Sequence, residues 1–499
     1  MGTCSPDWPP RSSAALQATG TMQEGPLGGM LAHMRTTAEQ LSDVLDHWQT
    51  GTGPLYIQLA NAIVSLAESG SLEHGARMPS ERALADHLHL SRNTVTAAYQ
   101  RLRDAGWLEV RPGAAPTLGV SSRGVLGLSP QERFAQILTG ESQPVVAFNT
   151  ASPPPAPAVT EALRDLSGFL GGPPALGNGY AALGDRDLVL AITQHLRRNG
   201  IPARPEEVVV TSGAQQAIWL VVTMLATSRR PVALESVTYP GVFDAVQASG
   251  SRPLALPMGP DGLDVAGSIK LLRAARPDLA YTTTFHNPTG TAISDDDAHL
   301  LLEASAALGT IVIDDRTIGD LALDGGPRTP FAAMGTNASV ITVGGMSKVF
   351  WGGLRIGWLH TNATLAAQLR HRRAAMDLGS PALFQRVAAR LLAEHYEETL
   401  RWRVASMLDS LDAVDEAVAE HGLDWEYRRP VGGPALWVRL PDGGAARFAA
   451  RAAEAGAPVA SGTAFEVLPG TGADRFRLPF YLPPEDMRLG IKVLAERAV

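Results

Sequence analysis

The sequence predicts an α/β protein with a mainly parallel sheet and a smaller α+β C-terminal part, preceded by a separate small helical domain. Two patterns lead to this prediction. From about residue 148 to residue 499, short β-branched runs alternate with longer helix-like stretches, which is typical of a parallel sheet covered by helices. Across residues 41–120, apolar residues instead recur at helical spacing in short segments. Residues 1–40 and 121–147 are rich in small and polar residues and are interpreted as a disordered tail and a linker.

The expected elements of the larger domain follow from the apolar runs. The predicted strands of its main sheet are residues 208–210, 231–234, 279–284, 310–313 and 340–343. The clearest helices between them are residues 214–226, 264–275 and 295–307. A long helical stretch up to residue 420 and two further strands, 436–440 and 475–478, complete the chain. Because ligands in parallel sheets bind at the carboxyl ends of the strands, the residues after each strand are the candidates for a site.

Composition sets limits on the class of protein. A chain of 499 residues is too long for one ordinary domain, and 45% hydrophobic with 18% charged residues is a globular composition. The single cysteine, Cys4, excludes an internal disulfide framework and fits a reducing compartment. No apolar run approaches the roughly 20 residues of a membrane span, and the N-terminus lacks the pattern of a signal peptide. We therefore expect a cytoplasmic protein. With a net charge of −8, any nucleic-acid binding would be confined to one module.

The sequence pattern of the small domain predicts three helices followed by a strand and a turn. The first helix is marked by apolar residues at helical spacing: Leu55, Leu59, Ile63 and Leu66. Ser80 is a plausible N-cap for a second helix over residues 82–87, and Ser91 for a third. Two short helices joined by a tight turn are typical of a helix-turn-helix, and residues 106–113 outline a wing.

In such a motif, polar residues at the start of the second helix of the pair reach base edges, while the preceding helix crosses the DNA backbone. The residues predicted to contact DNA are Ser80, Arg82, Ser91, Arg92, Asn93, Thr94, Thr96 and Arg101. The same spacing is also compatible with a small helical bundle whose arginines are merely solvated.

The most informative stretch of the larger domain is residues 342–358. A predicted strand leads into Gly344 and Gly345, and Lys348 follows directly. A lysine whose stem packs among apolar residues has a lowered pKa and is nucleophilic toward an aldehyde. Most lysines after a strand are solvated surface charges, so this interpretation requires other segments that could hold a cofactor.

Four upstream segments meet that requirement, although each also has an ordinary structural explanation. The small-residue turn 211–216 opens a helix, and a helix N-terminus binds anions such as a phosphate. Tyr239 could stack on a flat ring, and Asn287 could donate to a ring hydroxyl. Asp314 and Asp315 end a buried strand, where a carboxylate requires a cationic partner such as a protonated pyridine nitrogen.

Two family resemblances strengthen this interpretation. Residues 54–113, which contain PLYIQLA, GARMPSERALA and LSRNTVTAAYQRLRDAGWL, resemble the winged helix of the GntR regulators. From about residue 145 to residue 499, the ordered motifs SGAQQ, YPG, NPTG, DD and S-K-(x)6-R resemble fold-type I pyridoxal phosphate enzymes, the aminotransferases among them. The whole chain is identified as a member of the MocR-like subfamily of GntR regulators, which joins a winged helix to an aminotransferase-like sensor domain.

The resemblance implies roles for individual residues. Lys348 would hold pyridoxal 5'-phosphate as an internal aldimine, Asp314 would pair with the pyridine nitrogen, Asn287 would contact the ring oxygen and Tyr239 would stack on the ring. The residues expected around the phosphate are Ser212, Gly213, Ala214, Gln215, Ser347 and Arg355.

Three further residues follow from the same resemblance. Arg477 would receive the carboxylate of a substrate or effector, a task that its bidentate fork suits. Tyr180 resembles the tyrosine that such folds lend to the partner subunit's phosphate, which implies a homodimer. Arg316 stands where the family usually has a tyrosine that reaches the ring oxygen, so it is expected to contact the cofactor.

The predicted function is a pyridoxal phosphate-dependent, DNA-binding transcriptional regulator that senses an amino acid, an amine or the cofactor itself through aldimine chemistry on Lys348. The first alternative is a catalytically active aminotransferase. The second is a regulator whose sensor domain has lost cofactor binding and only dimerises, a reading disfavoured by the presence of Lys348, Asp314, Asn287 and Arg355. No metal site is predicted.

Overall fold

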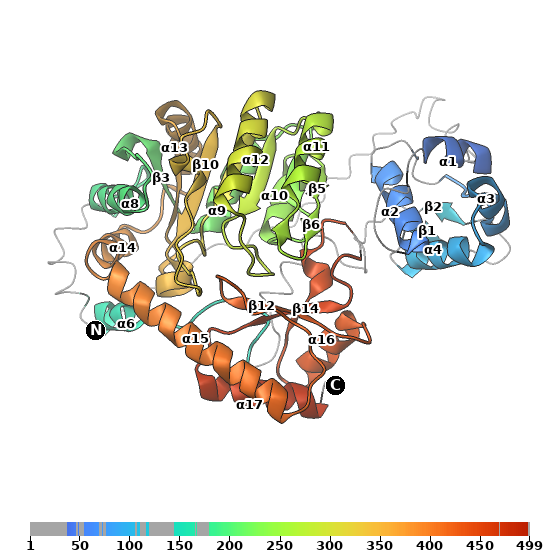
Figure 1. Cartoon of the computed structure of the whole chain (residues 1–499). Coiled ribbons are helices and arrows are strands. Elements are labelled where there is room, and N and C mark those ends of the chain that lie inside the picture. Colours follow the sequence, from blue (N-terminus) through green and yellow to red (C-terminus); the bar gives the residue numbers. More distant parts are fainter. Residues whose placement is uncertain are drawn as a thin grey trace, which may run out of the picture. The chain divides into compact units, whose positions relative to one another are not determined.

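The computed structural model describes residues 37–45, 48, 54–68, 72, 76–104, 107–109, 116–118, 144–164, 166, 179–468 and 470–497. The chain divides into two compact units, Met1–Ser121 and Ser122–Val499, and each is described by itself (Figure 1). Nearly all of the predicted tail and linker, and the turn of the predicted wing, lie outside the described residues.

The described residues of the N-terminal unit form four helices and a two-stranded antiparallel sheet. Its elements are α1 (Ala38–Val44), α2 (Leu55–Glu68), α3 (Glu81–Leu88), α4 (Arg92–Asp104), β1 (Leu108–Glu109) and β2 (Thr117–Leu118). Helix α1 begins inside the range predicted as tail, because Thr37 and Gln40 form a capping box that starts it earlier. Of the four apolar residues predicted on the first helix, Leu59 and Ile63 are fully buried and Leu66 is partly buried, whereas Leu55 at the start of the helix is 41% exposed. Leu84 of α3 and Val95 of α4 are also fully buried.

The turn between α3 and α4 determines the helix-turn-helix geometry. Ser80 caps α3 by accepting a hydrogen bond from Ala83 N at 3.2 Å. His89 ends that helix in the left-handed region, with φ 53°, which reverses the chain within two residues. Ser91 Oγ then accepts from Thr94 N at 3.1 Å at the start of α4. The predicted pair of short helices is therefore confirmed.

The larger unit is built on a seven-stranded sheet (Figure 1). In spatial order its strands are β3 (Val208–Thr211), β11 (Gly357–His360), β10 (Val340–Gly345), β9 (Ile311–Asp315), β8 (Leu279–Thr283), β4 (Val232–Glu235) and β5 (Pro253–Leu256). Strand β11 is antiparallel to both neighbours, and all other pairs are parallel. Strands β5 and β11 were missing from the sequence prediction, since neither PLAL nor GWLH contains a β-branched run.

Helices cover both faces of this sheet. On one face, apolar side chains of the strands pack with α9 (Ala214–Leu225), α10 (Gly241–Ala248) and α13 (Ala363–Asp377). On the other face, α11 (Val265–Ala275) and α12 (Asp295–Leu308) pack against β4, β8 and β9. Every residue of β3, β4 and β8 is buried, which explains why these strands appear in the sequence as continuous apolar runs.

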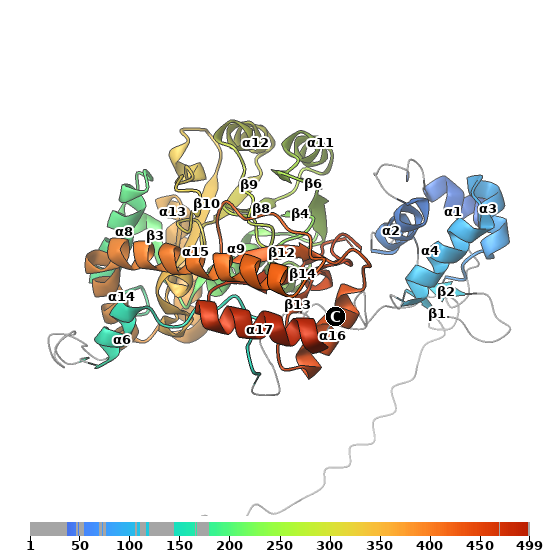
Figure 2. The same cartoon turned by 60° about the horizontal axis from the view of Figure 1, so that its bottom comes forward.

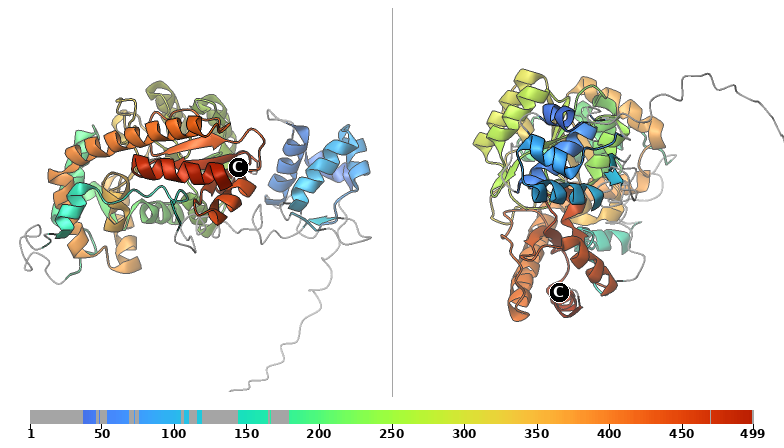
Figure 3. Two further views of the ribbon diagram at one scale, coloured as in Figure 1. Left: turned by 90° about the horizontal axis from the view of Figure 1, so that it is seen from below. Right: turned by 90° about the vertical axis from the view of Figure 1, so that its right-hand side faces the viewer.

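The remaining elements flank this sheet or follow it. They are α6 (Pro157–Arg164), α8 (Arg186–Arg198), the hairpin strands β6 (Met258–Gly259) and β7 (Gly262–Leu263), α14 (Ala382–Glu394), α15 (Tyr396–Glu420), β12 (Ala435–Arg439), α16 (Ala445–Glu454), β13 (Ala460–Ser461), β14 (Arg475–Pro479) and α17 (Pro484–Arg497). Strands β12, β14 and β13 form an antiparallel sheet in that order. The long helix α15 runs beside α17 along this sheet (Figures 2 and 3). None of the described helices is both long and apolar enough to cross a membrane.

Candidate functional site

A cavity of about 390 Å³ opens at the carboxyl ends of the sheet strands. The parallel register places Thr283 of β8 beside Asp315 of β9, and both line this cavity. Residues from the turn after β3, from the segment after β10 and from β14 complete the wall. This is the edge at which ligands of parallel sheets bind, so we call this cavity the main pocket.

Lys348 lies in the wall of the main pocket on one turn of π-helix, Ser347–Trp351, that directly follows β10. Its neighbours Val349 and Phe350 are buried and hold the turn in place. Lys348 Nζ donates a hydrogen bond to the carbonyl of Ala151 at 2.6 Å. Burial, together with the nearby Arg477 cation, lowers the pKa of Lys348 to about 8, and Asp315 partly opposes this shift. About a tenth of the amine is therefore neutral and nucleophilic at pH 7, far more than for a lysine with the ordinary pKa of 10.5.

One end of the main pocket is suited to an anion. Gly213, with φ 95°, precedes the N-terminus of α9, and Arg355, with φ 52°, lies against it and donates to the carbonyl of Ser212. The φ of 95° favours glycine at position 213, and a Cβ there would also lie only 3.1 Å from the Arg355 guanidinium. The free amides at the helix N-terminus and a cation together favour a phosphate.

Five of the six residues predicted around the phosphate line the main pocket: Gly213, Ala214, Gln215, Ser347 and Arg355. Ser212 is the exception. Its hydroxyl lies 2.9 Å from Ser380 Oγ and accepts from Arg373 at 3.1 Å, so its side chain is directed to the helix behind the pocket. The prediction for Ser212 is therefore wrong for its side chain.

The two carboxylates at the end of β9 have different surroundings. Asp315 lines the main pocket, and its carboxylate accepts from the Tyr281 hydroxyl at 2.6 Å and from Thr317 N at 2.9 Å. Asp314 is fully buried and does not line the pocket. Successive side chains of a strand point to opposite faces, so only one of the pair can face the cavity. The structure places Asp315 there and overturns the prediction for Asp314.

The Asp314 side chain instead makes hydrogen bonds within the fold, away from the main pocket. Its carboxylate accepts from Thr284 Oγ1 and from Phe331 N, each at 3.1 Å. Burial raises the pKa of Asp314, and the nearby Arg316 cation partly counteracts that effect. The Arg316 guanidinium donates to Thr284 Oγ1 at 3.3 Å and to the carbonyl of Arg328 at 3.2 Å.

Arg316 is accordingly absent from the wall of the main pocket, and the following residue, Thr317, lines it. The expectation that Arg316 takes the place of a ring-contacting tyrosine is wrong for the same reason as that for Asp314. The chain leaves β9 at this point, and the side chain that reaches the cavity is that of the threonine.

Three predicted residues are brought into the main pocket from distant elements: Tyr239, Asn287 and Arg477. Arg477 is only 4% exposed, donates to the carbonyl of Asn149 at 2.8 Å and stacks over Phe465. Among the described residues its Nε has no hydrogen-bond partner. Burial lowers the pKa of Arg477 to about 10, which still leaves it a cation at neutral pH. A buried guanidinium with an unused donor is suited to receiving a carboxylate. Tyr180 is 70% exposed and lies outside this pocket.

Sequence reasoning missed several lining residues, among them Thr150, Ala151, Thr283 and Thr317. Thr283 and Thr317 could have been found, because they end or follow strands whose neighbours were already candidates. Behind Thr283 lies Glu235, whose pKa burial raises to about 8, and which accepts hydrogen bonds from the backbone and hydroxyl of Thr283.

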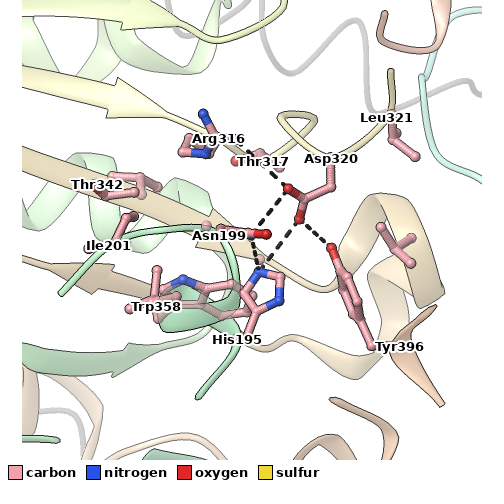
Figure 4. Close-up of a pocket in the computed structure, with 15 residues that line it drawn as sticks. His195, Asn199, Ile201, Arg316, Thr317, Asp320, Leu321, Thr342, Trp358 and Tyr396 are labelled. Atoms are coloured by element: carbon pink, nitrogen blue, oxygen red, sulfur yellow. Dashed lines mark hydrogen bonds and ion pairs between the residues drawn. The ribbon is translucent and has the colours of Figure 1, made fainter. Parts of the chain in front are cut away.

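A second, much smaller cavity of about 20 Å³ lies next to the turn that begins at Arg316. Figure 4 shows His195, Asn199 and Tyr396 converging on Asp320. His195 Nε2 lies 3.5 Å from Asp320, and burial lowers the pKa of His195. This space holds about one water molecule, so it is a packing feature behind the main pocket rather than a ligand site.

The predicted DNA-contacting residues lie on α3, on α4 and in the turn before each. Arg82, Ser91, Arg92 and Asn93 are exposed. Thr94 and Arg101 are partly buried. The hydroxyls in this set are already engaged: Ser80 caps α3, the Ser91 and Thr94 hydroxyls lie 2.8 Å apart, and the Thr96 hydroxyl donates to Glu81 at 2.7 Å. That bond ties α4 to α3 and gives Thr96 a structural role.

Comparisons with known proteins match the two parts of the chain to two different families. Residues 147–494 match the family described as aminotransferase class I and II, and residues 55–117 match bacterial regulatory proteins of the gntR family. YisV of Bacillus subtilis, named an uncharacterized HTH-type transcriptional regulator, is 28% identical over 91% of this chain and 98% of its own length. The HTH-type transcriptional regulator TauR of Rhodobacter capsulatus is 27% identical over 78% of this chain and 85% of its own length.

A solved structure resembles the larger unit. LysN, the α-aminoadipate aminotransferase of Thermus thermophilus, crystallised with N-(5'-phosphopyridoxyl)-L-leucine, superposes with a TM-score of 0.66 and 26% identity. The match covers 73% of this chain and 93% of LysN. The chain belongs to the class I and II aminotransferase family, and it carries a gntR-family regulatory domain ahead of the aminotransferase-like unit.

Proposed function

We propose that this protein is a pyridoxal 5'-phosphate-dependent, DNA-binding transcriptional regulator that works as a homodimer in the cytoplasm. Its effector is an amine or amino acid that enters the main pocket. The observation that carries the proposal is the combination, on one chain, of a helix-turn-helix with a pocket that is lined by a partly buried lysine of lowered pKa and by two arginines.

The residues of the main pocket fit pyridoxal phosphate. Gly213, the amides at the start of α9 and Arg355 would hold the phosphate. Asp315 would face the pyridine nitrogen, with the Thr317 hydroxyl donating to its carboxylate, and Asn287 is a polar group available to the rest of the ring. When bound, the cofactor supplies an aldehyde that condenses with a primary amine and releases water. Lys348 is the amine that the chain provides.

The chain's own groups prepare this reaction. Burial lowers the pKa of Lys348 to about 8, so the residue can be neutral without a dedicated base. Arg477, with its free Nε–H, would orient a carboxylate of the effector by a bidentate contact. An effector acts on DNA binding only if it binds two arrangements of the protein with different affinity.

In the N-terminal unit, α4 would enter the major groove, with Arg92 and Asn93 at its exposed start. Arg82 at the start of α3 would contact the phosphate backbone. The homology to YisV and TauR, which spans both units, supports a regulator over an isolated enzyme.

An active aminotransferase is the second candidate. The 2-aminoadipate transaminase of Thermus thermophilus is 32% identical over 255 residues, which are 49% of this chain and 62% of that protein. The main pocket also keeps a lysine, a carboxylate and a carboxylate-binding arginine together. Transfer of an amino group to a keto acid at enzymatic rates by the purified protein would favour this candidate.

The decisive experiment follows the visible absorbance of the purified protein while candidate amines and amino acids are titrated in. In parallel, affinity for a DNA fragment from the protein's own promoter region is measured with and without each compound. A regulator changes its spectrum and its DNA affinity at the same effector concentration. A protein that retains no visible absorbance once unbound pyridoxal phosphate has been removed by gel filtration refutes the proposal.

A further inference from the structure

Two cations of the main pocket hold the same stretch of main chain. Arg477 Nη2 donates to the carbonyl of Asn149 at 2.8 Å, and Lys348 Nζ donates to the carbonyl of Ala151 at 2.6 Å. We call residues 149–154 the strap. In the chain, the strap comes soon after residues 122–143, which connect the larger unit to the DNA-binding unit.

A third cation holds the far end of the strap. Arg403 of α15 donates to the carbonyl of Pro154 at 2.9 Å. It also donates to the carbonyls of Val349 at 3.2 Å and Phe350 at 3.1 Å, in the turn that carries Lys348. Arg403 is 1% exposed and does not line the main pocket. Its guanidinium therefore fastens the strap to the Lys348 turn without meeting a ligand.

The sequence of the strap explains why carbonyls are its attachment points. Pro153, Pro154 and Pro155 have no N–H and cannot donate to a neighbouring strand, and they keep the chain extended. On either side of the strap, backbone N–H groups donate ordinary hydrogen bonds to backbone carbonyls. Phe148 N donates to the carbonyl of Pro458, and Ala156 N donates to the carbonyl of Phe350, each at 3.0 Å.

The three attachments differ in what competes with them. Lys348 and Arg477 line the main pocket, and they are the groups that would engage an aldehyde and a carboxylate. A ligand that takes the Lys348 amine competes directly with the Ala151 carbonyl for the same donor. Arg477 holds Asn149 through Nη2 and keeps an unpaired Nε–H, so a carboxylate there does not have to displace the strap. Arg403 faces no such competitor.

We propose that the strap is a ligand-released element: binding in the main pocket withdraws Lys348 from the Ala151 carbonyl, while Arg403, acting as a positioning residue, keeps the end of the strap attached to the Lys348 turn. This inference rests on the proposed function and adds the route by which the pocket affects the chain leading to the DNA-binding unit. The coupling is a competition for one hydrogen-bond donor, the Lys348 amine.

Hydrogen–deuterium exchange of the full chain, read in peptides covering residues 144–152, tests the proposal. Lys348→Ala removes one attachment without any cofactor, and we expect exchange there to become about tenfold faster, as for one lost charge-assisted hydrogen bond. Pyridoxal phosphate should speed exchange in the native protein and have no further effect in Lys348→Ala. Arg429→Gln, which changes an exposed arginine paired with Asp412 and Asp415, is the control and should leave this segment unchanged.

Exchange in Lys348→Ala equal to that of the native protein overturns the strap, and so does slower exchange with pyridoxal phosphate. If the native protein does not bind pyridoxal phosphate, the proposed function fails, and the Lys348→Ala arm still decides the strap. Arg477→Gln provides an independent second variant with the same expected direction.

Arg403 is tested by a readout that a general loss of stability would not change. In Arg403→Gln, the pH midpoint for covalent capture of pyridoxal phosphate by Lys348 should shift, because the Lys348 turn loses its attachment. Arg403→Lys, which can reach one carbonyl, should restore part of the shift. A midpoint identical to that of the native protein and of Arg429→Gln overturns the positioning role. If Arg403→Gln does not fold, the Arg403→Lys midpoint compared with that of Arg429→Gln decides it.

Discussion

Replacing Asp315 by asparagine and, separately, Asp314 by asparagine distinguishes the two carboxylates at the end of β9. Both substitutions keep the size of the side chain and remove the negative charge. Asp315 lines the main pocket, whereas Asp314 is fully buried behind it. We expect Asp315→Asn to weaken pyridoxal phosphate binding, because a charge-assisted bond to the ring nitrogen contributes about 1.5–3 kcal/mol, which corresponds to roughly 10- to 150-fold in Kd.

Asp314→Asn should act on stability instead. Asp314 accepts from Thr284 and Phe331 N and lies near Arg316, so the uncharged amide weakens contacts within the fold. We expect a loss of about 1–2 kcal/mol in the free energy of unfolding, with the cofactor Kd changed by less than about threefold.

The assay is an absorbance titration with pyridoxal phosphate for the Kd, together with urea unfolding followed by circular dichroism for the stability. Each variant serves as the control for the other, since the two differ by one position on the same strand. A larger loss of cofactor affinity in Asp314→Asn than in Asp315→Asn would refute the assignment of the inward-facing carboxylate.

Other measurements test the remaining roles. Borohydride reduction should attach pyridoxal phosphate covalently to the native protein and not to Lys348→Ala; an equal yield of adduct contradicts the assignment. Because the pKa of Lys348 is lowered to about 8 from an ordinary value of 10.5, the neutral amine increases as pH rises through about 8. The rate of capture should therefore rise roughly tenfold from pH 7 to 9 and then level off, whereas a rate still rising through pH 10 would indicate an ordinary lysine. Arg92→Ala should weaken DNA binding and reduce the salt slope by about one, with Arg428→Ala as an exposed control outside the helix-turn-helix; equal binding by both variants counts against the recognition helix. Arg477→Gln should weaken binding of amino acids by about tenfold or more while leaving amines without a carboxylate nearly unaffected, and an equal loss for both ligand classes would exclude a carboxylate contact.

Local patterns were sufficient for much of this protein. The helix-turn-helix could be predicted because caps such as Ser80 and apolar spacing are properties of neighbouring residues. Lys348 and Gly213 could be placed in one pocket because each comes just after a strand, and parallel strands bring their carboxyl ends together, whereas Arg355 was placed there by the family resemblance. These inferences need only the chain order and the period of the elements.

Two properties of the site could be learned only from the three-dimensional fold: the side of a strand on which a side chain lies, and its contacts with residues far away in the sequence. A strand's alternation establishes that Asp314 and Asp315 point to opposite faces, but only the packing of β9 in the sheet decides that Asp315 meets the cavity. From the sequence, Thr96 is expected to be free for DNA, but in the fold its hydroxyl donates to Glu81 of α3. From the sequence alone, one can predict which residue types follow the strands and therefore lie at the carboxyl ends of the sheet. The fold selected which of them face the pocket, because side-chain direction and contacts such as Lys348 with Ala151 arise between residues far apart in the chain.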